Sequence, residues 1–252
     1  MPKLPPVFSD SLFDAITKTE PEVRRTFGPL IQELHGFLND LPCLRGLQEA
    51  RRRAIGIEPR HPEAFGASTI KQGQWYTFNH GGRNEMQFNI GMCGQSAKNP
   101  GYLRVGLAWN IYGPSRRTVN SSFESFRSLI AREERSWDAF VKANKLEIEW
   151  THPNGHFNEW TRTNEVTEWV LRPPLPKYDW ILIGRLLRRD IDNIVLSDPR
   201  LLKNVIESVF SGSCPFGRRP NVWLTPVNWL FFVISSFPDA DSNMKISHPF
   251  WS

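Results

Sequence analysis

Two acidic residues stand where a metal-dependent nuclease would place its carboxylates. Glu85 opens the sequence Glu85-Met86-Gln87, and Asp179 directly precedes the apolar run 180–187. Nucleases of the restriction type hold Mg²⁺ with carboxylates at strand ends, and the lysine of an E-x-K pattern orients the attacking water. Gln87 stands at the position of that lysine, and no E-x-K follows Pro238-Asp239. Glu85 and Asp179 are therefore the candidate catalytic residues, and Mg²⁺ is the expected cofactor if the chain is a nuclease.

Other catalytic signatures are incomplete. His152 and His156 have a metal-binding spacing, but a proline and a glycine between them predict a turn instead of a helix. A nucleophile pair of Cys93 and His80 is the alternative for covalent chemistry. The chain has no G-x-S-x-G elbow, no Walker A motif and no G-x-G-x-x-G motif, so we expect no nucleotide cofactor.

Composition favours a soluble protein of a reducing compartment. Hydrophobic residues make up 40% of the chain and charged residues 23%, which is typical of globular domains. The three cysteines include no C-x-x-C pair, which argues against a zinc ribbon and a disulfide scaffold. The N-terminus does not resemble a signal peptide, and the longest apolar stretch, 222–237, is short and contains Pro226 and Asn228. We expect a cytoplasmic protein without a membrane partner.

Basic residues indicate a polyanionic partner. The formal net charge is +5 and the sequence pI is about 9.3. Each phosphate that Lys or Arg neutralises releases counterions, so arginine clusters favour nucleic-acid binding. The candidate nucleic-acid-binding arginines are Arg51, Arg52, Arg53, Arg83, Arg104, Arg116, Arg117, Arg188 and Arg189. A basic surface without a nucleic-acid partner is the alternative.

A polar strand face is needed to position some of these residues. Between residues 85 and 92, apolar side chains alternate with Glu85, Gln87 and Asn89, which predicts a strand with one buried and one polar face. Gln87 and Asn89 therefore join the nucleic-acid-binding candidates.

A second predicted strand, 102–111, carries Arg104, Gly106 and Ala108 on one face. If it pairs antiparallel with the first, these residues lie beside the polar row. Their small size leaves room for a ligand or for another element of the same chain.

The remaining pattern predicts an α+β fold. A helix begins near Thr19 and is interrupted at Gly28-Pro29 by a kink or by division into two shorter helices. Residues 1–73 form a helical N-terminal subdomain and 74–252 a mainly antiparallel sheet with two packed helices, or the whole chain is one compact domain. The order after residue 74 is β-β-β-α-β-β-β-α. Its predicted strands are 75–78, 85–92, 102–111, 146–150, 163–171 and 180–187, and its predicted helices are 121–144 and 197–212.

One segment resembles a known class of protein. GGRNEMQFNIG, followed by the YLRVGLAW strand, resembles recognition modules of bacterial restriction-type, modification-dependent endonucleases. The resemblance covers residues 75–112 and implies DNA recognition, including recognition of modified bases. It places Arg83, Glu85, Gln87 and Asn89 on a binding face. The Cys/His nuclease finger that would complete such a protein is missing, which implies a separate nuclease subunit as partner.

Three functions remain open from the sequence. The first is a nucleic-acid-binding protein, DNA above all, in bacterial restriction or antiviral defence. The second is a metal-dependent nuclease with a diverged carboxylate site. The third is a protein-interaction module with a basic surface.

Overall fold

A computed structural model describes residues 3–41, 87–93, 100–111, 121–150, 161–172 and 180–213 of the 252-residue chain. All of them belong to one compact unit, Met1–Arg218. The predicted strand 75–78 lies outside the described residues.

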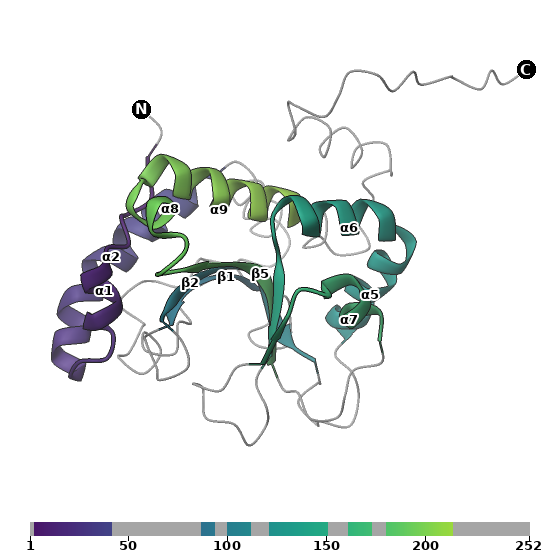
Figure 1. The fold of residues 1–252 in the computed structure, drawn as a ribbon, viewed down its shortest axis with the longest axis horizontal. Coiled ribbons are helices and arrows are strands. Elements are labelled where there is room, and N and C mark those ends of the chain that lie inside the picture. Colours follow the sequence, from purple (N-terminus) through teal and green to yellow (C-terminus); the bar gives the residue numbers. More distant parts are fainter. Residues whose placement is uncertain are drawn as a thin grey trace, which may run out of the picture. The chain divides into compact units, whose positions relative to one another are not determined.

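An antiparallel sheet forms the centre of this unit (Figure 1). Its strands are β1 (Gln87–Cys93), β2 (Tyr102–Asn110), β3 (Glu147–Trp150), β4 (Thr161–Thr163) and β5 (Trp180–Arg188). They lie in the order β1-β2-β5-β3-β4, and neighbouring strands are antiparallel. The α+β class and the predicted strands that correspond to β1, β2, β3 and β5 are confirmed. The predicted antiparallel pairing of the first two is also correct, since Asn89 lies opposite Gly106.

Helices precede the sheet, connect its strands and follow its last strand along the chain. They are α1 (Asp10–Ala15), α2 (Glu20–Asp40), α5 (Ser121–Arg132), α6 (Glu134–Ala143), α7 (Val166–Leu171), α8 (Asn193–Ser197) and α9 (Pro199–Ser213). The predicted helix 121–144 is thus two helices that meet at Glu133. In contrast, α2 continues through Pro29, so its division into two shorter helices is wrong. Within the described ranges, no helix combines the length and the apolar character that a membrane crossing requires.

One face of the sheet packs against α9. Phe88, Ile90 and Met92 alternate along β1 and are buried, as strand geometry requires for one apolar face. The ring of Phe88 meets that of Phe210 from α9 edge to face, with centroids 5.4 Å apart. α9 begins where Asp198 Oδ1 accepts hydrogen bonds from the backbone N–H groups of the first turn. Figure 1 shows the sheet curving away from this helix, so the opposite face is concave.

The predicted strand 163–171 is wrong in most of its length. Only Thr163 belongs to β4, and the chain then turns into α7. In α7, Val166 and Val170 are buried one helical turn apart. The guanidinium of Arg127 in α5 donates from Nε to Val170 O at 2.8 Å and from Nη2 to Leu171 O at 3.1 Å. These bonds satisfy carbonyls that the end of a helix leaves without an intrahelical partner, so tertiary contacts select the helix.

Gly106 lies on β2 directly opposite Gly184 of β5. A Cβ on Gly106 would lie 2.2 Å from the carbonyl oxygen of Ile183, and one on Gly184 would lie 2.3 Å from that of Val105. The room beside the polar row is therefore filled by another strand of the same chain. The sequence leaves open whether a ligand or another element of the same chain occupies this room, and the structure shows an element of the same chain.

Candidate functional site

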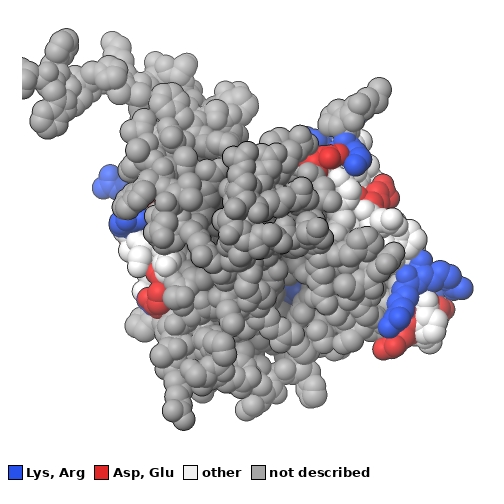
Figure 2. Space-filling view, turned by 180° about the vertical axis from the view of Figure 1, so that it is seen from behind, with Lys and Arg blue, Asp and Glu red and all other residues white. Residues whose placement is uncertain are grey.

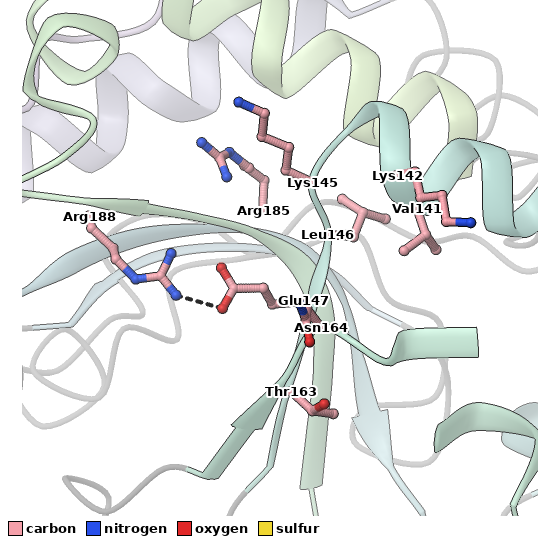
Figure 3. A pocket seen from close by; sticks show the side chains of 9 residues that line it. All are labelled: Val141, Lys142, Lys145, Leu146, Glu147, Thr163, Asn164, Arg185 and Arg188. Atoms are coloured by element: carbon pink, nitrogen blue, oxygen red, sulfur yellow. Dashed lines mark hydrogen bonds and ion pairs between the residues drawn. The ribbon is translucent and has the colours of Figure 1, made fainter. Parts of the chain in front are cut away.

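A basic pocket lies at the end of the sheet where β5 finishes and β3 begins. Its volume is about 670 Å³. Four of the nine side chains that line it are basic and one is acidic. The lining residues are Val141, Lys142, Lys145, Leu146, Glu147, Thr163, Asn164, Arg185 and Arg188 (Figure 3). An excess of positive charge in a cavity of this size makes an anion the ligand that it fits best.

Strand pairing brings the lining residues together from distant parts of the chain. β3 pairs with β5 so that Glu147 lies opposite Gly184. Arg185 and Arg188 follow Gly184 on β5, so they lie beside the turn that leads into β3. Figure 3 shows the side chains of Arg185 and Lys145 on the same side of that turn and Lys142 pointing away from them. The pocket therefore exists only once β3 and β5 have paired.

The turn between α6 and β3 places Lys145 at the pocket in an unusual backbone conformation. Lys145 has φ of +49°, the left-handed region that glycine usually occupies after a helix. Its N–H donates to Lys142 O at 3.1 Å, and the N–H of Leu146 donates to Val141 O at 2.9 Å. These two bonds form a Schellman motif, which closes the helix. A lysine here costs about 1 kcal/mol relative to glycine, and it adds a cation to the lining.

Three of the four pocket cations have an acidic partner. Lys142 Nζ lies 2.6 Å from Asp138 Oδ2, and this hydrogen bond is the main reason why the pKa of Asp138 is lowered. Arg185 Nη2 lies 2.6 Å from Asp192 Oδ1, and Arg188 Nη2 lies 2.5 Å from Glu147 Oε2.

Lys145 is the pocket cation without an ion pair among the described residues. Its side chain is exposed. An incoming anion would therefore meet a free ammonium group at the rim and two arginines that are already oriented by acids.

Basic and acidic side chains are mixed on the described surface that Figure 2 draws. On the face of the molecule seen in Figure 2, the described basic and acidic side chains lie close to one another instead of forming a patch of one sign. Exposed pairs of this kind neutralise each other and attract a polyanion poorly. The pocket, with four basic side chains and one acidic side chain in its lining, is therefore the candidate anion site.

A second polar cluster lies on the concave face of the sheet and is fully buried. The hydroxyl of Tyr102 donates to Glu149 Oε1. Arg104 Nη1 lies 3.7 Å from Glu149 Oε2, and both side chains have no exposed surface. The guanidinium of Arg104 also lies over the ring of Trp180, 4.9 Å from its centroid. Because both charges of this ion pair are fully buried, they do not form part of an open binding surface.

Several predicted site residues fall in these two places. Arg188 lines the basic pocket. Arg104 and Asn89 are buried on the concave face, where Asn89 Oδ1 has no hydrogen-bond partner among the residues that the structure describes. Gln87 is the first residue of β1 and pairs with Ala108.

Arg189 is held away from the pocket by the N-terminal helix α1. Its guanidinium donates hydrogen bonds to Asp14 and Asp10. These bonds raise the pKa of Arg189, and the bond to Asp14 has the larger effect. Its charge is therefore already neutralised by two carboxylates. The predicted site residues that lie outside the described part of the chain are Arg51, Arg52, Arg53, Arg83, Glu85, Arg116, Arg117 and Asp179.

Sequence reasoning missed most of the pocket. Lys142 and Lys145 are distant in sequence from Arg185, because about 40 residues separate the α6–β3 turn from β5. The one available signal was Arg185, a charged residue inside an otherwise apolar strand. Such a residue needs a partner or an opening beside it.

No group of His, Cys, Asp and Glu residues suited to holding a metal ion occurs within the described ranges. Neither a protein-family model, nor a curated protein, nor a solved structure matches this chain.

Proposed function

We propose that this protein binds nucleic acid, DNA above all, and that the basic pocket contacts backbone phosphates. The observation that carries the proposal is the pocket lining: a cavity of about 670 Å³ is lined by Lys142, Lys145, Arg185 and Arg188, with Glu147 as the acid among its described residues. The positive net charge of the chain supports it, because counterion release favours binding of a basic surface to a polyanion.

The chemistry of the lining favours phosphate over base contacts. None of the nine described lining residues is aromatic, so this part of the lining offers no platform on which a base could stack. Arginine and lysine are the side chains that bind phosphate oxygens, and Thr163 and Asn164 add a hydroxyl and an amide that donate to the same group. Contacts of this kind fix the position of a nucleic acid without reading its sequence.

A role in bacterial restriction or antiviral defence, alongside a separate nuclease subunit, belongs to the same proposal. It is supported by the resemblance of residues 75–112 to recognition modules of modification-dependent endonucleases. In that setting, the pocket would supply affinity for the backbone while other residues of the chain discriminate among bases.

Lys145→Gly is the variant that tests the proposal most sharply. Glycine adopts the backbone conformation of Lys145 without strain, so the variant keeps its fold while losing the free cation. The assay is fluorescence anisotropy of labelled duplex and single-stranded oligonucleotides at several salt concentrations. The loss of one phosphate contact lowers the slope of log K against log salt by about one, and the affinity at 0.1 M salt falls about eightfold.

Lys18→Gly provides the matched control. Lys18 is also an exposed lysine just after a helix, and its N–H also donates to a carbonyl three residues earlier, but it belongs to the α1–α2 turn and does not line the pocket. We expect this variant to bind like the wild-type protein. Equal binding by wild type and Lys145→Gly, or no binding of either oligonucleotide at low salt, overturns the proposal. Cleavage of the duplex when Mg²⁺ is added would instead identify a nuclease.

A further inference from the structure

Glu147 occupies a position in the pocket where an anionic ligand would be expected. It is the acid among the nine lining residues, and its Oε2 lies 2.5 Å from Nη2 of Arg188. Figure 3 shows its carboxylate extending from β3 toward Arg188. A carboxylate and a phosphate present similar oxygen pairs to an arginine. The free protein therefore already contains an anion on Arg188, and this anion is part of the chain itself.

The neighbouring acid, Asp192, is anchored much more firmly than Glu147. Asp192 Oδ1 accepts from Arg185 Nη2 at 2.6 Å, and its Oδ2 accepts from the backbone N–H of Arg188 at 2.8 Å. Both of its oxygens are thus in use, and its side chain is 10% exposed. Asp192 orients the arginines and does not line the pocket.

Only one carboxylate oxygen of Glu147 is bonded to a described residue. Among the described residues, Arg188 is its ion-pair partner, and the bond involves only Oε2. Its side chain is 16% exposed and that of Arg188 is 27% exposed, so solvent reaches both partners. Rotation of the Glu147 side chain would release Arg188 without breaking any backbone hydrogen bond of β3.

We propose that Glu147 is a built-in competitor, which occupies Arg188 in the free protein and is displaced by a phosphate group of the ligand. The inference rests on the proposed function, because it assigns the same pocket to phosphate. The displaced arginine then forms two parallel hydrogen bonds to phosphate oxygens. Lys145 contributes a point charge to the same group.

The competitor makes the pocket selective for charge. A ligand must exceed the attraction that a single carboxylate exerts on Arg188, which a singly charged anion such as acetate does not. A compact anion with several charges, such as pyrophosphate or two consecutive backbone phosphates, does so because each added charge also interacts with Lys145 and Arg185. The substrate class is therefore a polyphosphate or a polynucleotide backbone, rather than a carboxylate metabolite.

Glu147→Gln tests the inference by removing the charge and keeping the shape. The probe is sodium pyrophosphate, titrated into wild type and variant in a calorimeter, with sodium acetate as a second probe. Removing one negative charge within about 4 Å of the bound anion raises the pyrophosphate affinity at least about fivefold. Glu207→Gln is the matched control, because Glu207 also has a 2.5 Å ion pair, with Lys203, and does not line the pocket. We expect Glu207→Gln to bind pyrophosphate like the wild type.

Two further variants keep the test decisive. Glu147→Asp retains the charge but shortens the side chain by one methylene, so that it no longer reaches Arg188, and a smaller gain in affinity is expected. In Glu147→Gln/Arg188→Met the gain disappears, because the released arginine is missing. Unchanged or weaker pyrophosphate binding by both Glu147 variants, with thermal midpoints near that of wild type, overturns the inference.

The outcomes separate this inference from the proposed function. If pyrophosphate affinity rises in Glu147→Gln while no oligonucleotide binds either protein, the role of Glu147 as a competitor is supported and the proposal of nucleic-acid binding is refuted. If oligonucleotide binding depends on Lys145, but Glu147→Gln changes the affinity for neither oligonucleotide nor pyrophosphate, nucleic-acid binding is supported and the role of Glu147 as a competitor is refuted.

Discussion

Replacement of Gly106 by alanine tests the central contact of the sheet. β2 and β5 approach each other through Gly106 and Gly184, which lie directly opposite. An alanine Cβ at position 106 would lie 2.2 Å from the carbonyl oxygen of Ile183 and 2.5 Å from the Cα of Gly184. Ordinary contact begins at 3.4 Å, so one strand must move by about 1 Å or more. The atoms in the way belong to the backbone and cannot rotate aside.

The size of the effect follows from what such a shift breaks. β2 pairs with β1 on its other side and β5 pairs with β3, so neither strand can move without disturbing a second ladder. Overpacking of a well-packed core costs about 1–3 kcal/mol. Because this clash is with backbone on a central strand pair, we expect a loss of about 3 kcal/mol in the free energy of unfolding.

Urea unfolding, followed by the fluorescence of the ten tryptophans, measures this loss. Gly36→Ala in α2 is the control, because the nearest atom to its new Cβ is the flexible end of Lys3 at 3.9 Å. Alanine is favoured over glycine inside a helix by about 0.8–1.0 kcal/mol, so this variant should be more stable than wild type. The same chemical change thus has opposite signs at the two positions.

The double variant Gly106→Ala/Gly184→Ala adds a second check. Once the first alanine has separated the strands, the second meets less resistance, so the combined loss should be smaller than the sum of the two single losses. A loss below about 0.5 kcal/mol for Gly106→Ala, or equal effects of Gly106→Ala and Gly36→Ala, would refute the reasoning.

Three more predictions concern the contacts of charged side chains. Arg104→Met removes the cation beside the buried carboxylate of Glu149 and should cost about 3–5 kcal/mol in urea unfolding, whereas Arg104→Met/Glu149→Leu should cost less than the sum of the single changes. Arg127→Met removes the two bonds that end α7, so we expect a loss of about 1–3 kcal/mol and faster amide exchange in α7 as measured by NMR. Lys142 lowers the pKa of Asp138, which stabilises the fold above the unfolded pKa of that carboxyl and less so as pH falls through its folded pKa. In Lys142→Met the pKa of Asp138 should rise toward its ordinary value in a carboxyl ¹³C titration, and an unchanged titration would contradict the assigned cause.

Hydrophobic periodicity was sufficient to predict an element wherever one period continued through the whole element. The alternation within Gln87–Cys93 and Tyr102–Asn110 predicted two strands and their apolar faces. The prediction of an open polar face was wrong, because Asn89 and Arg104 on the opposite face are buried as well. The apolar run that became β5 predicted a strand with neighbours on both sides, and Ser197-Asp198-Pro199 marked the start of α9. These features depend on neighbouring residues and on the period of two or 3.6 that each element imposes.

Hydrophobic periodicity was not sufficient to predict the short element α7. α7 has only six residues, and its four apolar side chains fit a strand or a short helix. Hydrogen bonds from Arg127 of another helix favour the helix. In the same way, Pro29 was read as a breaker, yet α2 continues through it because its buried face packs along the whole length. A propensity of about 3 kcal/mol can be overridden by packing.

The fold class, the strands with a clear period and the basic character of the chain could all be predicted from local patterns. The position of the basic pocket could not, since it depends on the pairing of β3 with β5, which places Lys145 beside Arg185 and Arg188. The tertiary structure also decided that Arg104 is an internal ion-pair partner and that Gly106 closes a strand contact. The physical reason is that periodicity fixes which face a side chain occupies, whereas its neighbours across the sheet come from segments whose distance along the chain carries no local signal.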